Sequence, residues 1–494
     1  MYRYLFAILF LSITFTQSEY RVRQDFNFSD YGSESSNVRN EQQLLDLINS
    51  IVVENNIPGL SVTFVKGQDV VWDSYFGFSN IDENIQVDEN TMFILSSVSK
   101  TITATALMQL WESNLFDINE SINNYLPFDV IHPGFLNTPI TFKMLLSHTS
   151  GISDNWGFMP YYDGDSPIDL QYYLEQYLTT EGDYYDSNLN FTNSEPGTNF
   201  EYSNIAVALI GLLIQEISNQ PFNDFCRSNI FEPLGMENTY WFLSEIEDLN
   251  KVAMPYLIDG ASGDSCSEIG CFYVQGNSCF CDPSCLDYQD CCPDYNNVCV
   301  ENNNDISPFN AYMHYGYSDY PSGQLRSTSK DLSKFMSAYM NDGIQDGVRI
   351  LNSQTIDYIK TIHYPSANSS QGLIWYYKNQ SGRELIGHNG GDTGSLTEMF
   401  FSPSNEVGVV LLTNSSSYNA LMEIENAVLD FAENFEPIVL GDINSDNTTN
   451  IQDVILIIGM ILNDQYNQLA DINSDSSVDV SDIILVVNII LNIN

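Results

Sequence analysis

The chain has 494 residues, 43% of them hydrophobic, which is enough material for more than one domain with its own core. Sixteen Lys and Arg residues stand against 65 Asp and Glu residues, so the formal net charge is -49. A charge of this sign and size repels phosphate backbones and anionic lipid surfaces. The composition therefore predicts a globular protein and argues against nucleic-acid binding.

The first 18 residues have the pattern of a secretory signal peptide. Met-Tyr-Arg precedes an apolar core from Tyr4 to Phe15, and small and polar residues follow. This core is too short for a standard membrane span, and no later stretch reaches ~18 uninterrupted apolar residues. We therefore expect a secreted or cell-surface-associated protein with a polar linker over residues 19–40; an uncleaved N-terminal anchor is the alternative.

Residues 41–435 combine strand and helix patterns. A helical periodicity between Leu44 and Val52 is followed by two strand-like runs, 60–65 and 70–76, with a polar turn between them. Strand patterns return near the end of this region, after a mostly helical middle. The pattern predicts an α+β fold in which one sheet is built from both ends of the region.

A candidate nucleophile lies where an apolar run meets a helical pattern, in Ser97-Val98-Ser99-Lys100. A serine hydroxyl needs a base to become a nucleophile, and a lysine three residues further along a helix lies on the same face. The start of a helix also favours developing negative charge. We therefore expect Ser97 and Lys100 to act together.

Two later segments complete a pattern. Tyr202-Ser203-Asn204 precedes an apolar run, and His388-Asn389-Gly390-Gly391 precedes the strand-like run 398–401. With Ser-x-x-Lys, these segments in this order resemble the serine beta-lactamase family, in its class C, DD-peptidase and esterase branch. The resemblance covers residues 41–435 and includes the segments 57–62, 145–152, 231–236 and 323–328.

The resemblance implies a mixed α/β fold, with an antiparallel sheet flanked by helices, an all-helical subdomain and the site between the two. It implies that Ser97 forms an acyl-enzyme and that its proton goes to Lys100 and Tyr202, either of which can be the base. The implied catalytic residues are Ser97, Lys100, Tyr202, Asn204, His388, Gly390 and Gly391. Asn204 would orient the scissile bond, the N–H groups of Ser97 and Gly391 would form the oxyanion hole, and no cofactor is implied for catalysis.

Two histidines and one cysteine in this region carry separate expectations. His388 stands where beta-lactamases commonly have a lysine, and a histidine is largely neutral at pH 7. Beta-lactamase action is therefore disfavoured, while peptidase and esterase activities stay open. His148, in Ser147-His148-Thr149-Ser150-Gly151, is expected to support a turn, and Cys226 to be a buried free thiol.

Eight of the nine cysteines crowd into residues 264–301. They are Cys266, Cys271, Cys279, Cys281, Cys285, Cys291, Cys292 and Cys299. In an exported chain this density indicates a disulfide framework, and the segment has no histidine to favour the alternative, a zinc site. The spacing resembles a somatomedin B domain inserted into the region 41–435, and we expect this insertion either to contact a protein partner or to form a rim over the cleft. Eight cysteines allow 105 pairings, so no connectivity is assigned.

After a linker at 436–440, an acidic pattern occurs twice within residues 441–494. Each copy places oxygen-bearing residues at positions 1, 3, 5, 9 and 12, with a backbone carbonyl at position 7, as calcium loops do. The donors are Asp442, Asn444, Asp446, Thr448, Asn450 and Asp453, then Asp471, Asn473, Asp475, Ser477, Asp479 and Asp482. Both loops lack glycine at position 6 and end in Asp, unlike an EF-hand, and the pair resembles a type I dockerin. That resemblance implies two calcium ions and a cohesin partner; two acidic turns without metal are the alternative.

The leading hypothesis is therefore an exported serine hydrolase attached by its tail to a larger assembly. Its substrate would be a peptide with a D-residue, for a DD-peptidase or D-aminopeptidase, or an ester. A beta-lactamase is the second hypothesis. The third is a non-catalytic scaffold that displays the cysteine-rich segment.

Overall fold

The computed structural model describes residues 38–258, 309–435 and 441–491, except for the single residues 39, 68, 445, 447, 464 and 474. The chain divides into two compact units, Met1–Glu433 and Asn434–Asn494. The predicted signal peptide, most of the linker at 19–40, the cysteine-rich segment 264–301 and the linker at 436–440 lie outside the described residues.

The first unit is built on a seven-stranded antiparallel sheet in the order β13-β14-β15-β16-β1-β2-β3. Its strands are β1 (Gly59–Lys66), β2 (Asp69–Asn80), β3 (Ile85–Gln86), β13 (Tyr376–Gln380), β14 (Arg383–Asp392), β15 (Ser395–Ser402) and β16 (Val407–Thr413). Because β1 pairs with β2 on one side and β16 on the other, both ends of the region meet in one sheet. The predicted hairpin and antiparallel sheet are thus confirmed.

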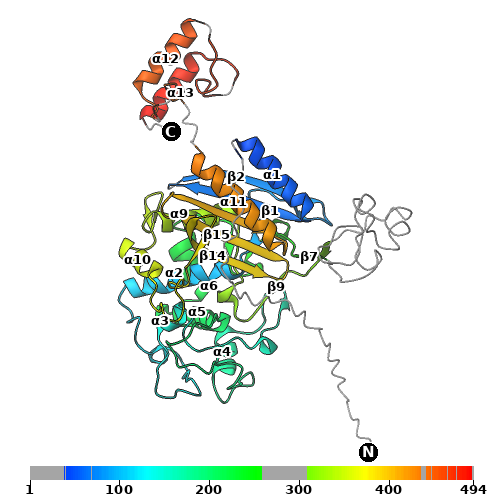
Figure 1. Ribbon diagram of the computed structural model, residues 1–494, viewed down its shortest axis with the longest axis vertical. Helices are drawn as coiled ribbons and strands as arrows, with labels where there is room; N and C mark the ends of the chain where they lie inside the picture. The colour runs from blue at the N-terminus through cyan, green and yellow to red at the C-terminus, as the bar shows by residue number, and fades with distance from the viewer. Residues whose placement is uncertain are drawn as a thin grey trace, which may run out of the picture. The chain divides into compact units, whose positions relative to one another are not determined.

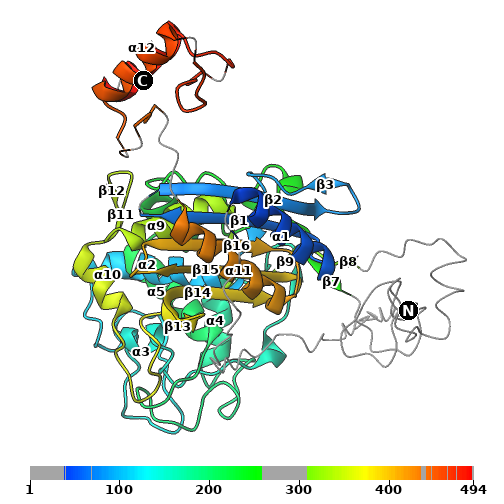
Figure 2. The ribbon, with the colours of Figure 1, turned by 45° about the horizontal axis from the view of Figure 1, so that its top comes forward.

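Helices cover both faces of this sheet (Figures 1 and 2). On one face lie α1 (Glu41–Glu54) and α11 (Tyr418–Asn434), and on the other lies α9 (Ser329–Met340). Adjacent residues of β1 show the two faces, since Phe64 packs against Phe431 of α11 while Thr63 hydrogen-bonds Ser329 of α9. β1 is buried on both faces, and along it the apolar Leu60, Val62 and Phe64 alternate with small polar residues whose hydroxyl groups hydrogen-bond Ser329.

Along the chain, a helical region separates the first three strands of this sheet from the last four. Its helices are α2 (Ser99–Glu112), α3 (Phe142–Leu146), α4 (Leu170–Leu178), α5 (Asn204–Ser218) and α6 (Phe222–Cys226). The whole run from Ile205 to Ile214 of α5 is buried. Cys226 is a buried free thiol, as predicted, and burial raises its pKa. In the described part of the chain no single helix has the length and apolarity of a membrane span; α5 and the helix after it meet this test only as a bent pair.

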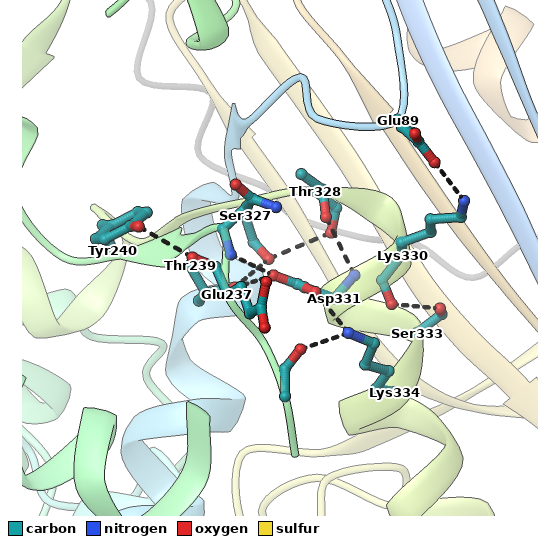
Figure 3. Close-up of polar contacts among 12 residues, drawn as sticks. Glu89, Glu237, Thr239, Tyr240, Ser327, Thr328, Lys330, Asp331, Ser333 and Lys334 are labelled. Atoms are coloured by element: carbon teal, nitrogen blue, oxygen red, sulfur yellow. Dashed lines mark hydrogen bonds and ion pairs between the residues drawn. The ribbon is translucent and has the colours of Figure 1, made fainter. Parts of the chain in front are cut away.

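A small sheet fixes the segment that leads to Ser97. In it β10 (Arg326–Ser327) pairs with β4 (Phe93–Ile94) and with β6 (Thr239–Tyr240). Asp331, at the start of α9, ties this sheet to the helix: its carboxylate accepts from Thr239 Oγ1 and pairs with Lys334 at 3.0 Å (Figure 3). The segment that leads to Ser97 is therefore held in place by β10, which comes much later in the sequence.

A buried ionic cluster lies on the α11 side of the sheet. Lys378 of β13 is 2.9 Å from Glu398 of β15 and 2.8 Å from Glu425 of α11. All three side chains are buried, so two carboxylates share one ammonium group. Burial, together with Glu425 and against the pull of Lys378, raises the pKa of Glu398 to about 7.

The second unit contains α12 (Ile451–Leu462) and α13 (Val480–Leu491). The helices pack through a small apolar core of Val454, Ile457, Ala470 and Val486. The side chains of Asn450 and Asp453 form a capping box at the start of α12, which ties the first predicted calcium loop to this helix.

The raised pKa of Glu398 predicts a pH-dependent stability. Because Glu398 binds its proton more tightly in the folded chain, its favourable contribution is complete below about pH 4.5 and is lost as the pH rises towards 7. Between pH 5 and 7, we expect the wild type to lose on the order of 1–3 kcal/mol of unfolding free energy relative to Glu398→Gln. Urea unfolding measures this difference. The exposed Glu384→Gln is the control, and identical pH dependence in wild type and Glu398→Gln would contradict the account.

Candidate active site

Ser97 lies on a tight turn between β4 and α2. The turn is a short 3₁₀ segment, Ser96–Val98, in which Ser96 has a φ of +48°, a value uncommon for a residue other than glycine. Strand β14 presses directly on this turn, because a Cβ added to Gly390 would lie 2.9 Å from Ser97 N. Glycine at position 390 is therefore required for β14 to pass the candidate nucleophile.

Lys100 joins three segments of the chain. Its Nζ donates to Ser97 Oγ at 2.9 Å, to Asn204 Oδ1 at 2.7 Å and to the carbonyl oxygen of Ser322 at 2.6 Å. The same Nζ lies 4.9 Å from the centroid of the Tyr202 ring. The structure thus brings together Ser97, Lys100, Tyr202 and Asn204, which the sequence places in two segments about a hundred residues apart.

Asp154 orients Asn204, although the sequence did not predict Asp154 as a site residue. Its carboxylate accepts from the Asn204 backbone N at 2.9 Å, from Asn204 Nδ2 at 2.8 Å and from Ile205 N at 3.1 Å. Because Nδ2 is held by Asp154, the amide oxygen of Asn204 points to Lys100. Asp154 belongs to no recognisable motif, and its only sequence signal is that it follows Ser147–Ile152 closely.

His388 forms part of the opposite wall and is buried, with 3% of its surface exposed. Its Nδ1 donates to the carbonyl oxygen of Asn389 at 2.5 Å, and its ring centroid lies 6.3 Å from that of Tyr202. Burial, reinforced by the charge of Lys100, lowers the pKa of His388 to about 3. His388 is therefore neutral at pH 7.

The end of β14 beyond the glycines is acidic and aromatic. Gly391 pairs with Leu396 of β15, and Asp392 follows directly. The Tyr161 hydroxyl donates to Asp392, and the Tyr315 hydroxyl donates to the carbonyl oxygen of Thr393. Alternation along a strand places Asp392 on the same face as His388 and Gly390, so a carboxylate lies at this edge of the site.

These observations place a candidate serine nucleophile beside a lysine, a tyrosine and an asparagine, next to strand β14 of an antiparallel sheet. A protein-family model described as Beta-lactamase matches residues 38–433. The chain therefore belongs to the penicillin-binding protein and beta-lactamase family of serine hydrolases.

Individual relatives are distant. The chain is 25% identical over 387 residues to penicillin-binding protein 4* of Bacillus subtilis (strain 168), covering 76% of this chain and 71% of that protein. It is 21% identical to protein flp of Staphylococcus aureus (strain NCTC 8325 / PS 47), again over 76% of this chain but only 64% of the relative. The chain thus spans less than two thirds of the length of protein flp.

Solved structures share the fold. D-amino acid amidase from Ochrobactrum anthropi SV3, complexed with L-phenylalanine, superimposes with a TM-score of 0.55 at 21% identity, covering 79% of this chain and 99% of that chain. A class C beta-lactamase gives a TM-score of 0.53 at 17% identity, covering 80% and 98%. At these identities the likeness establishes the fold, while the substrate has to be argued from the site.

The second unit holds the two predicted calcium loops. In the first, Asp453 Oδ1 accepts from Ile443 N at 2.8 Å and Asp453 Oδ2 from Asn450 N at 2.9 Å; Asp482 accepts from Ile472 N at 2.8 Å in the second. The buried carboxylates of the loops are Asp442, Asp453, Asp471 and Asp482. No Lys, Arg or His follows His388 in the sequence, so a bound cation would fit these loops.

The loops would also need ligands other than carboxylates. No three His, Cys, Asp or Glu side chains within the described residues converge on one metal position. The remaining ligands would be amide and carbonyl oxygens, such as those of Asn444 and Thr448, which calcium accepts.

The low pKa of His388 predicts that its ring does not titrate in the neutral range. The chain has five histidines, and the signal that disappears in His388→Asn identifies this one by NMR of 13C-labelled imidazoles. We expect its chemical shift to stay constant from pH 8 to 5, because the ring remains neutral until well below its ordinary pKa. A titration midpoint near 6.5 would contradict this description of the wall.

Proposed function

We propose that the first unit hydrolyses an amide or ester bond through an acyl-enzyme on Ser97. The observation that carries this proposal is the contact of 2.9 Å between Lys100 Nζ and Ser97 Oγ, within a buried cluster that also holds Asn204. A nucleophile within hydrogen-bonding distance of its base, with the base oriented by a third group, is the arrangement that acyl transfer requires.

The geometry accounts for proton removal. Asn204 Oδ1 and the Ser322 carbonyl can only accept, so a neutral Lys100 would donate its two N–H groups to them and direct its lone pair at Ser97. Tyr202, whose ring faces the Lys100 nitrogen, is the alternative base. Either group can take the Ser97 proton and return it to the leaving amine or alcohol.

The remaining steps follow from the same residues. Ser97 Oγ adds to the substrate carbonyl carbon, and the N–H groups of Ser97 and Gly391 would stabilise the resulting oxyanion. Collapse of this intermediate breaks the amide or ester bond and leaves the acyl group on Ser97. Water, deprotonated by the Lys100 and Tyr202 pair, then releases the acid.

The charges around the site favour substrates whose leaving group carries no carboxylate. His388 is neutral, and Asp392 contributes a carboxylate on the same face of β14. A penicillin, or a peptide ending in a free D-residue, would bring its own carboxylate towards this wall without meeting a fixed cation there. A D-amino acid amide, an N-terminal D-residue or a neutral ester fits this wall better.

Two measurements test the proposal: intact-protein mass spectrometry, which detects a covalent adduct, and assays of substrate turnover. Each compares the wild type with Ser97→Ala and with Ser113→Ala, a control at the exposed end of the same helix. We expect turnover of D-phenylalanine p-nitroanilide or p-nitrophenyl butyrate, with a loss of about 10³-fold or more in Ser97→Ala alone. Benzylpenicillin should form an adduct slowly or not at all.

The absence of both adduct and Ser97-dependent turnover with all three compounds would contradict the proposal and favour the scaffold hypothesis. Rapid turnover of benzylpenicillin would instead favour the beta-lactamase.

For the second unit, we propose two bound calcium ions and docking to a cohesin-type protein. The acidic loops in a segment without basic residues support calcium, because a divalent cation would offset the repulsion between their carboxylates. The helices also expose large apolar side chains, namely Ile451, Ile455, Leu456, Ile458, Leu462, Val480, Ile484, Ile489 and Leu491. Such a surface supports a protein partner.

Export and a protein partner for the cysteine-rich segment remain proposals from the sequence.

Calcium binding should depend on the last residue of each loop. Titration calorimetry of the full chain, in salt that screens surface carboxylates, should give about two tight sites, and Asp453→Ala or Asp482→Ala should each remove one. The exposed Glu423→Gln on α11 is the matched control. Equal calcium uptake by the wild type and both loop variants would contradict this assignment.

A further inference from the structure

His148 contacts three consecutive residues at the candidate site. It follows α3 and is fully buried, with a φ of +55°. Its carbonyl oxygen accepts from Glu201 N at 2.8 Å, and its Nδ1 accepts from Ser203 N at 3.2 Å. Between these two bonds, its ring stacks on Tyr202 with the ring centroids 4.4 Å apart and the planes 30° apart.

The hydrogen bond from Ser203 fixes the state of the imidazole. Because Nδ1 accepts, the ring proton lies on Nε2, and the ring is neutral. The surroundings of His148 agree with this state: burial first, and then the charge of Lys100, lower its pKa well below the usual range, and the facing His388 ring is itself neutral. A protonated ring would lose its bond to Ser203 and add a second positive charge beside Lys100.

The backbone of His148 supports a role beyond the turn. A left-handed φ costs about 1 kcal/mol or more for a residue with a Cβ, and asparagine or glycine adopts it more readily. A turn alone gains nothing from a large buried ring whose Nε2 has no hydrogen-bond partner in the described residues. The contact with Tyr202 gives the ring a use.

We propose that His148 is a positioning residue that holds the Tyr202 phenol against Lys100 by stacking on its ring and bonding the backbone on both sides of it. This inference rests on the proposed function, because Tyr202 matters only if the Ser97 proton is handled by Lys100 and Tyr202. The hydrogen bonds of the His148 ring and carbonyl oxygen go to Ser203 and Glu201, on either side of Tyr202, and not to Ser97.

Two substitutions separate the ring from the turn. His148→Asn suits the left-handed backbone and retains a short acceptor for Ser203 N, but it removes the stacked ring. His148→Phe retains a ring and loses the acceptor. A residue that only shapes the turn should be replaced by asparagine without loss, whereas a positioning residue should not.

The first readout is kinetic. We expect His148→Asn to keep a melting temperature near that of the wild type, to lower kcat by about 10- to 100-fold with little change in KM, and to shift the acidic limb of the pH profile. In a Tyr202→Phe background the same substitution should lower kcat no further, since Tyr202 mediates its effect. Wild-type kcat and pH profile in His148→Asn, or losses that multiply with those of Tyr202→Phe, would overturn the proposal.

The second readout needs no substrate and so separates this inference from the proposed function. The 13C signal of the Tyr202 ring, identified by its loss in Tyr202→Phe, should move in His148→Asn and move less in His148→Phe. An unchanged signal would overturn the proposal even if the protein is an active hydrolase. If His148→Asn does not fold, His148→Phe carries the kinetic test with the same expected coupling to Tyr202.

Discussion

The hydrogen bonds of the buried Lys100 amino group are the interactions on which the candidate site depends. A polar amino group is costly to bury unless it is hydrogen-bonded, and here Ser97, Asn204 and Ser322 provide partners from three separate segments. Removing any one partner would leave the buried amino group poorly satisfied. The same contacts that stabilise Lys100 therefore fix its distance from Ser97, the proposed nucleophile, so folding and preorganisation of the candidate site share one cause.

The surrounding structure holds these segments from outside. Asp154 binds the first backbone N–H groups of α5 and the Asn204 amide, His148 holds the residues just before them, and Gly390 lets β14 approach the nucleophile turn. On the far side of the same sheet, the charges of Lys378, Glu398 and Glu425 are buried together between β13, β15 and α11. A neutral His388 and an acidic Asp392 then set the electrostatic character of the wall that faces the substrate.

The sequence predicted what short motifs and periodicity encode. The hairpin of β1 and β2, the helix α1 and the proximity of Ser97 and Lys100 follow from local patterns, whereas the resemblance to the family supplied Tyr202 and Asn204. Asp154 was not predicted, because its contacts to Asn204 join residues fifty positions apart without a pattern in either segment. Two other contacts were not predicted for the same reason, because the sequence around a single tyrosine or charged residue does not indicate its partner. They are the hydrogen bond from Tyr161 to Asp392 and the cluster of Lys378, Glu398 and Glu425. His148 was assigned to a turn, and its contacts with Tyr202 and Ser203 emerged only from the structure.

The most direct test of this account is a crystal structure of the protein with a phenylboronic acid, which adds to a serine nucleophile as a substrate carbonyl does. The account predicts a bond from boron to Ser97 Oγ, one boronate oxygen between the N–H groups of Ser97 and Gly391, and Lys100 Nζ still bonded to Asn204 and Ser322. Boron bound to another residue, or a Ser97 adduct whose oxygens point away from Gly391, would contradict it.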